Sequence, residues 1–139
     1  PMLLTFDAPD SNVCAVRREK SNTPLQALTL MNDAVFVECA QALGRRIVTE
    51  VPARSGEDRT TDRIRHGFRL CVGREPTPAE AERLGRLFDE LAEKCRARPE
   101  AAARLVGAQK PAGADVAEAA AWVALARALL NLDEFVTRE

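Results

Sequence analysis

The chain has 139 residues, of which 46% are hydrophobic and 29% are charged. This length and composition fit one globular domain that can bury a core without disulfides or metals, and they exclude a largely disordered chain. Twenty basic and twenty-one acidic residues leave a net charge of -1, so nucleic acid and anionic membranes are not expected partners. No run approaches the roughly 20 apolar residues of a membrane helix, so membrane insertion is not expected either.

Residues 1–22 predict an extended N-terminal arm. Residues 1–16 show no helical or strand periodicity, and residues 7–12 form a turn-rich cluster. The sequence also begins without a recognisable start region, from which we expect a fragment of a larger protein. Four apolar residues of the arm are expected to dock on the helices that follow: Leu3, Leu4, Phe6 and Val13.

Asn22-Thr23-Pro24 marks the start of the first helix. The Thr23 hydroxyl can accept from a free backbone N–H, and proline is favoured at the first helical position. Apolar residues then recur at helical spacing, which predicts a helix over 24–32. Asn32-Asp33 interrupts it, and Asp33 is placed to cap a second helix over 34–48. One stripe of that helix is expected to face the core: Phe36, Ala40, Leu43 and Ile47.

The middle of the chain predicts two further helices. The pattern of residues 60–72 is helical, and Gly73 stands where a C-terminal cap favours a left-handed residue. Thr77, with Pro78 after it and Glu80 three residues on, forms a capping box that opens a helix ending near Arg96. Pro99 can start a short helix through Val106.

The last predicted helix covers residues 116–131 and is apolar on nearly all sides. Asp115 and Glu118 repeat the capping-box pattern at its start. A helix that is apolar all round is usually buried among others, so this one is expected to be the central helix. The sequence therefore predicts a single all-α domain over 1–139, a bundle of about five helices at 23–139 with the extended arm at 1–22.

The cysteines and the single histidine do not predict a metal or cofactor. A structural zinc site normally shows close ligand pairs, and none is present. Three of the cysteines fall in apolar stripes, where a free thiol behaves as a small buried hydrophobe. One disulfide stays open as an alternative if the compartment is oxidising. The residues concerned are Cys14, Cys39, Cys71, Cys95 and His66, the first of which lies outside those stripes.

A cluster of charged and amide side chains around the first helix is the candidate binding site. Such side chains make directional bonds to carboxylates, sulfates or sugars. The simpler alternative, which we favour, is that they bond to the arm and to the helix ends. Glu134, with Asn131 and Asp133, is placed to extend this network. The candidate binding residues are Arg17, Arg18, Glu19, Asn22, Gln26, Asn32 and Glu134.

No catalytic residue is predicted. His66 can in principle act as a general base, but no serine or cysteine stands at motif spacing, and a surface position is expected. The aspartates lack the spacing of a calcium loop. Five arginines are interleaved with acids, which predicts a solvated helix face rather than a nucleic-acid site: Arg45, Arg46, Arg63, Arg65 and Arg69.

Several ordered motifs together resemble one family, the C-terminal part of the planctomycete proteins of domain of unknown function 1553 (DUF1553, PSD-type proteins). The resemblance covers essentially the whole chain. It implies an exported, periplasmic segment at the end of a longer protein, often after a companion domain and sometimes a cytochrome-c-like one. It implies no established activity, and the haem motif C-x-x-C-H is absent. The motifs are 6–10, 17–19, 22–28, 32–33, Phe36, 72–77, Trp122 and 129–135.

The functional hypothesis is a non-catalytic C-terminal module that stabilises neighbouring domains of its own chain, or binds a partner through Arg17 to Asn32. The alternatives are an active site completed by upstream domains and a module that binds polyanionic polysaccharide. Burial separates them, because a structural role predicts internal hydrogen bonds, whereas a site predicts side chains that converge in an open pocket.

Overall fold

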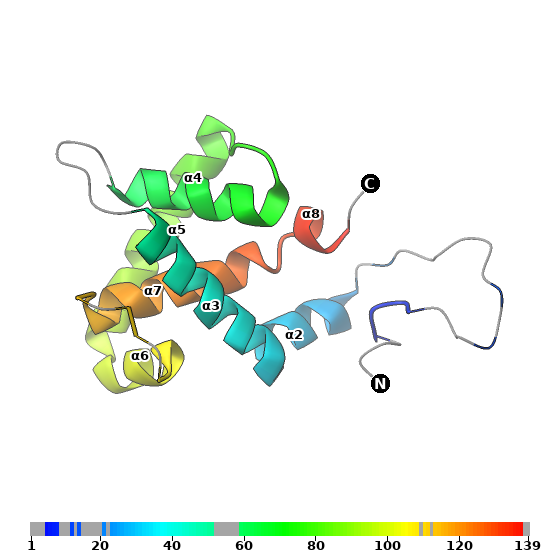
Figure 1. Ribbon diagram of the computed structural model, residues 1–139, viewed down its shortest axis with the longest axis horizontal. Coiled ribbons are helices and arrows are strands. Elements are labelled where there is room, and N and C mark those ends of the chain that lie inside the picture. The colour runs from blue at the N-terminus through cyan, green and yellow to red at the C-terminus, as the bar shows by residue number, and fades with distance from the viewer. Residues whose placement is uncertain are drawn as a thin grey trace.

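The computed structural model describes residues 5–8, 12, 14, 21, 23–51, 59–108, 110–111 and 113–137. Within these ranges the chain forms seven helices and no strand (Figure 1), which confirms the all-α prediction. The helices are α2 (Pro24–Asn32), α3 (Ala34–Glu50), α4 (Arg59–Val72), α5 (Pro78–Ala97), α6 (Pro99–Val106), α7 (Val116–Leu129) and α8 (Asp133–Val136).

The helices that the sequence predicted begin and end within two residues of the expected positions, and only α8 was not expected. Much of the predicted arm lies outside the described residues, so its boundary stays a prediction. One part of the arm is placed. The rings of Phe6 and Phe36 lie 5.8 Å apart, so Phe6 docks on α3 as expected.

Local capping chemistry sets the helix ends. Thr23 and Thr77 each accept a hydrogen bond from the backbone three residues on, ahead of a proline at the first helical position. Asp33 ends α2 and opens α3, where its carboxylate accepts from Val35 N. Gly73 closes α4 with a φ of 81°, a left-handed conformation that favours glycine.

α7 is the central helix, as its all-round apolar sequence predicted. Eight of its residues are buried, and it packs against α3, α4, α5 and α6 (Figure 1). Trp122 is 1% exposed, and its ring centroid lies 4.2 Å from that of Phe88. Gly44 lets α3 approach closely, because a Cβ there would lie 3.0 Å from Val123 N. The absence of a side chain at Gly44 therefore permits the tight α3–α7 contact.

The prediction that Cys39 is buried is wrong. Cys71 is buried and Cys95 is half-buried, but Cys39 is exposed, and all four cysteines are free thiols. Ala40 carries the core stripe of α3, and a neighbouring residue in a helix points about 100° away. Cys39 consequently faces away from α7 although it adjoins the apolar stripe in sequence.

Candidate functional site

Gln26 sits at the centre of a polar network that joins the arm to α2. Its side chain is 1% exposed. The amide oxygen accepts from Thr23 N at 2.9 Å, which completes a capping box. The amide nitrogen donates to Thr5 O at 2.8 Å, to Ser21 Oγ at 3.0 Å and to Asp7 Oδ2 at 3.3 Å. One side chain thus caps the helix and holds the arm.

Asp7 forms the opposite end of this network. Its φ of 54° is left-handed, a conformation that Asp adopts more readily than most residues. Its carboxylate accepts from Ser21 N at 2.9 Å and also from the Ser21 hydroxyl. This turn places the Asp7 carboxylate within reach of the Gln26 amide. Residues from near the beginning and from the end of the arm therefore meet at the start of α2.

Only three of the seven candidate binding residues lie within the described ranges. Gln26 is buried in the network above. Asn32 is exposed, and its amide donates to Leu28 O at 2.8 Å in its own helix. Glu134 lies on α8 and pairs with Arg74. Each of the three bonds to different residues of the chain, and whether any of the seven binds a ligand stays a prediction. The other four lie outside the described residues: Arg17, Arg18, Glu19 and Asn22.

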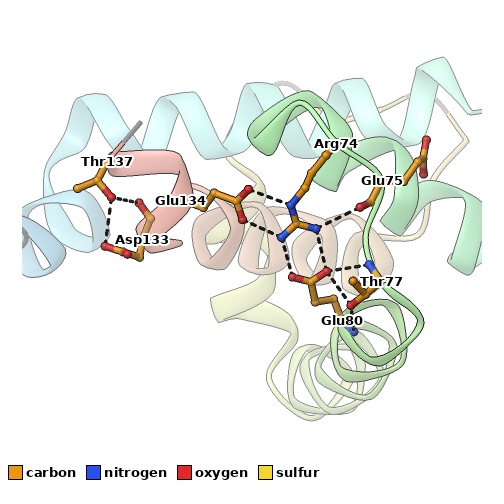
Figure 2. Close-up of polar contacts among 7 residues, drawn as sticks. All are labelled: Arg74, Glu75, Thr77, Glu80, Asp133, Glu134 and Thr137. Carbon is orange, nitrogen blue, oxygen red and sulfur yellow. Dashed lines mark hydrogen bonds and ion pairs between the residues drawn. The ribbon is translucent and has the colours of Figure 1, made fainter. Parts of the chain in front are cut away.

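Arg74 forms a second polar network, which the sequence did not single out (Figure 2). Its guanidinium donates to both carboxylate oxygens of Glu134, at 2.9 and 2.7 Å. It also donates to both oxygens of Glu80, at 3.0 and 2.8 Å, and to Glu75 O at 3.1 Å. The Arg74 Cζ lies 4.9 Å from the centroid of the Phe68 ring. This fork geometry links the α4–α5 turn to α8.

The two carboxylates are stabilised in their charged forms. Hydrogen bonds from Arg74, and then from the backbone and hydroxyl of Thr77, lower the pKa of Glu80 to about 2. Hydrogen bonds from Arg74 likewise lower the pKa of Glu134. Thr77 N donates to Glu80 Oε2 at 2.7 Å, so the capping box and the ion pair share one carboxylate. The cap of α5 and the position of α8 are thereby coupled through Glu80.

Arg63 corrects the prediction of a solvated arginine face, because it is 5% exposed. It donates to Glu118 Oε1 at 2.8 Å, to Val48 O at 2.9 Å and to Val51 O at 3.3 Å. Its Cζ lies 5.7 Å from the Trp122 ring centroid. The guanidinium satisfies carbonyls at the end of α3, where the helix itself supplies no partner.

Glu118 also differs from its predicted role. Asp115 Oδ2 accepts from Glu118 N at 3.1 Å, as a helix cap should. The Glu118 carboxylate, however, binds Arg63 and also Arg59, at 3.3 Å, instead of closing a capping box. The Glu118 carboxylate thus binds two arginines of α4 instead of accepting from the backbone N–H of Asp115, as a capping box requires.

His66 Nε2 lies 2.8 Å from Glu50 Oε2, and Glu50 pairs with Arg46 as well. Hydrogen bonds from Arg46 and then from His66 lower the pKa of Glu50.

Within the described ranges, no three His, Cys, Asp or Glu side chains are grouped to hold a metal ion. No helix in the described part of the chain is long and apolar enough to cross a membrane.

Sequence reasoning missed two signals. Thr23 and Gln26 have the spacing of a capping box, which points to a local bond for the Gln26 amide rather than a ligand. Arg74 lies in the turn between α4 and α5. Gly73 ends the first of these helices, and Glu80 belongs to the capping box that starts the second, so both ends of this turn are fixed. The partner of Arg74, Glu134, lies 60 residues further on, and no local pattern connects the two.

The fold is an all-α domain, and the polar networks around Gln26, Arg63 and Arg74 connect different segments of the same chain. The family model described as PSD1, protein of unknown function (DUF1553), matches residues 1–88, and the chain therefore belongs to this family. The matched range contains Gln26, Arg74 and Glu80 but ends within α5, so Glu134 lies beyond it. Comparisons with curated proteins and with solved structures give no match.

Proposed function

We propose that this chain is a non-catalytic structural module of a larger exported protein, in which it stabilises neighbouring domains of the same polypeptide. Support comes above all from Gln26. Its amide is buried, and both the oxygen and the nitrogen are bonded within the chain. A ligand could reach this amide only by breaking those bonds and leaving buried groups unpaired, which is costly.

The proposed role of the network is to fix the direction in which the arm leaves the bundle. Thr5, Asp7 and Ser21 all bond to the Gln26 side chain, which lies in the first turn of α2. A domain that precedes the arm would thus be held at a defined position relative to the bundle. The exported setting and the C-terminal place in the longer protein rest on the resemblance to planctomycete members of the family.

Replacing Gln26 by alanine tests this role, with Asn32→Ala as the matched control. Both amides lie on α2, but Asn32 is exposed and bonds only within its helix. Limited proteolysis of the full-length protein should cut residues 1–22 about tenfold faster in Gln26→Ala, since each lost hydrogen bond to a buried group costs on the order of 1 kcal/mol. Asn32→Ala should resemble the wild type.

The opposite pattern would favour a binding or catalytic site. Suppose that Gln26→Ala leaves the proteolysis rate and the melting temperature unchanged, but abolishes binding of a sulfated polysaccharide or an activity of the full-length protein. The structural proposal would then be wrong. The exported setting is tested separately, by locating the full-length protein in fractions of its native cell, and a cytoplasmic location would contradict it.

A further inference from the structure

One side of α3 is exposed at Val35, Glu38 and Cys39 and half-buried at Ala42 and Arg45. Positions 35, 38, 42 and 45 follow one another at spacings of three and four, and position 39 lies beside them, so they share one side of the helix. Val35 is 55% exposed, and an open groove of about 560 Å³ runs beside this face. We call it the α3 face. It comprises Val35, Glu38, Cys39, Ala42 and Arg45, which line the groove together with Gln41 and Ala108.

The two charges of the α3 face have no side-chain partner among the residues that the structure describes. Glu38 and Arg45 are seven residues apart, about 10.5 Å along the helix axis, which is too far for an ion pair with each other. Neither side chain has a hydrogen bond or ion pair to any other part of the chain that the structure describes. Arg46, the next residue along, is by contrast paired with Glu50 at 2.7 Å.

The face is complementary to itself when it is reversed. In an antiparallel pair of α3 helices, Glu38 can lie opposite Arg45 of the partner subunit while Arg45 lies opposite Glu38 of the partner subunit. The two-fold axis then passes between residues 41 and 42. Ala42 is small enough to let the helices approach at the short end of the usual range, about 8 Å between axes.

We propose that the protein forms a symmetric homodimer through the α3 face. The partner is a second copy of this chain, because Glu38 and Arg45 stand at opposite ends of the face. When a second α3 runs antiparallel, each acid meets a base, and a symmetric interface requires such self-complementarity. This goes beyond the proposed function, since it concerns another surface and does not depend on Gln26.

Charge reversal tests the pairing. Glu38→Arg and Arg45→Glu are made separately and together in the 139-residue protein. Sedimentation over a micromolar concentration series gives the dimer dissociation constant, and circular dichroism checks the fold. Each single reversal places like charges opposite each other twice and should weaken the dimer about tenfold or more, whereas the double variant should recover to within about threefold of the wild type.

A cross-link tests the register. Residue 42 lies only about 1.5 Å along the axis from its symmetry mate, whereas residue 39 is displaced from its own by about 7.5 Å. In a Cys14→Ser, Cys39→Ser background, Ala42→Cys should therefore form a disulfide dimer on mild oxidation, because a disulfide needs Cα atoms within about 7 Å. The Cys14→Ser protein, which keeps the native Cys39 thiol, is the control and should remain uncross-linked.

Three results would overturn the proposal. The wild type could stay monomeric across the concentration series. The dimer could persist with equal affinity in the two single reversals. The native Cys39 thiol could cross-link as fast as Ala42→Cys, which would place the axis elsewhere on α3.

Discussion

Arg63 and Arg74 perform similar tasks in opposite surroundings. Each binds a glutamate more than 50 residues further along the chain, Glu118 and Glu134 respectively. Arg63 is 5% exposed and also satisfies two backbone carbonyls. The Arg74 side chain is 40% exposed, although it makes more hydrogen bonds to carboxylates. The number of bonds therefore does not rank the two arginines by their contribution to stability.

The difference lies in what replaces each arginine when it is removed. Without Arg63, the Val48 and Val51 carbonyls lose a buried partner, and a buried polar group left unpaired costs free energy. Without Arg74, water can reach Glu80 and Glu134, and exposed ion pairs contribute little net stability. Arg63 is thus expected to stabilise the bundle, whereas Arg74 is expected to position α8.

The largest effect is expected for Arg63→Ala. We expect the free energy of unfolding to fall by about 3 kcal/mol, because the substitution breaks a largely buried pair and removes contact with Trp122. Urea denaturation followed by circular dichroism measures it. A loss no greater than that of the exposed control Arg65→Ala would contradict the distinction between the two arginines.

Glu118→Ala should have a smaller effect, about 1–2 kcal/mol, because Arg63 keeps its two carbonyl partners. Asp115→Ala is the comparison, since it removes only the cap of α7, worth about 1 kcal/mol.

In a double-mutant cycle, Arg63→Ala and Glu118→Ala should show a coupling energy, which the same urea experiment provides. Strict additivity would mean that the pair contributes nothing.

Arg74→Ala should change local order more than global stability. We expect the melting temperature to fall by no more than about 3 °C, because water replaces the exposed pairs. Hydrogen exchange at residues 133–137 should become faster, while α7 stays protected. In the wild type, high salt should also speed hydrogen exchange at residues 133–137, though less than the substitution does, and should leave exchange in α7 unchanged. Unchanged exchange in α8 would show that Arg74 does not hold it.

The smallest effect is a pH dependence carried by the Arg74 network. The pKa of Glu80 falls from an ordinary 4.5 to about 2 in the folded protein. The unfolded chain therefore binds the proton first, so this stability is present above about pH 4.5 and is lost as the pH falls toward 2. Exposure of the pair keeps the contribution small. Wild type and Glu80→Gln, compared by urea denaturation from neutral to acidic pH, should differ in slope only in the acidic range.

Helix ends were the part of the fold that could be read directly from the sequence. Thr23, Asp33, Gly73 and Thr77 act through bonds to residues only a few positions away, so their roles are local. The pattern of residues 116–131, apolar on nearly all sides, likewise predicted the central position of α7, because such a helix is usually buried among others.

The candidate site was less predictable, because its bonds join distant residues. Gln26 was named as a candidate binding residue, with bonding to the arm and the helix end as the favoured alternative, but its particular partners Asp7 and Ser21 could not be predicted. Arg63 was expected on a solvated face, but the end of α3 and Glu118 of α7 enclose it. Cys39 was expected in the core, but it is exposed, because its neighbour Ala40 occupies the buried side of α3.

The sequence by itself determined the secondary structure of this protein, its all-α class and its central helix, because capping and amphipathic periodicity depend on neighbours in the chain. Only the tertiary structure decided which glutamate each arginine binds, which polar side chain is buried and which side of α3 stays open. Those outcomes depend on how helices pack against one another, and contacts across 55 or 60 residues leave no local pattern.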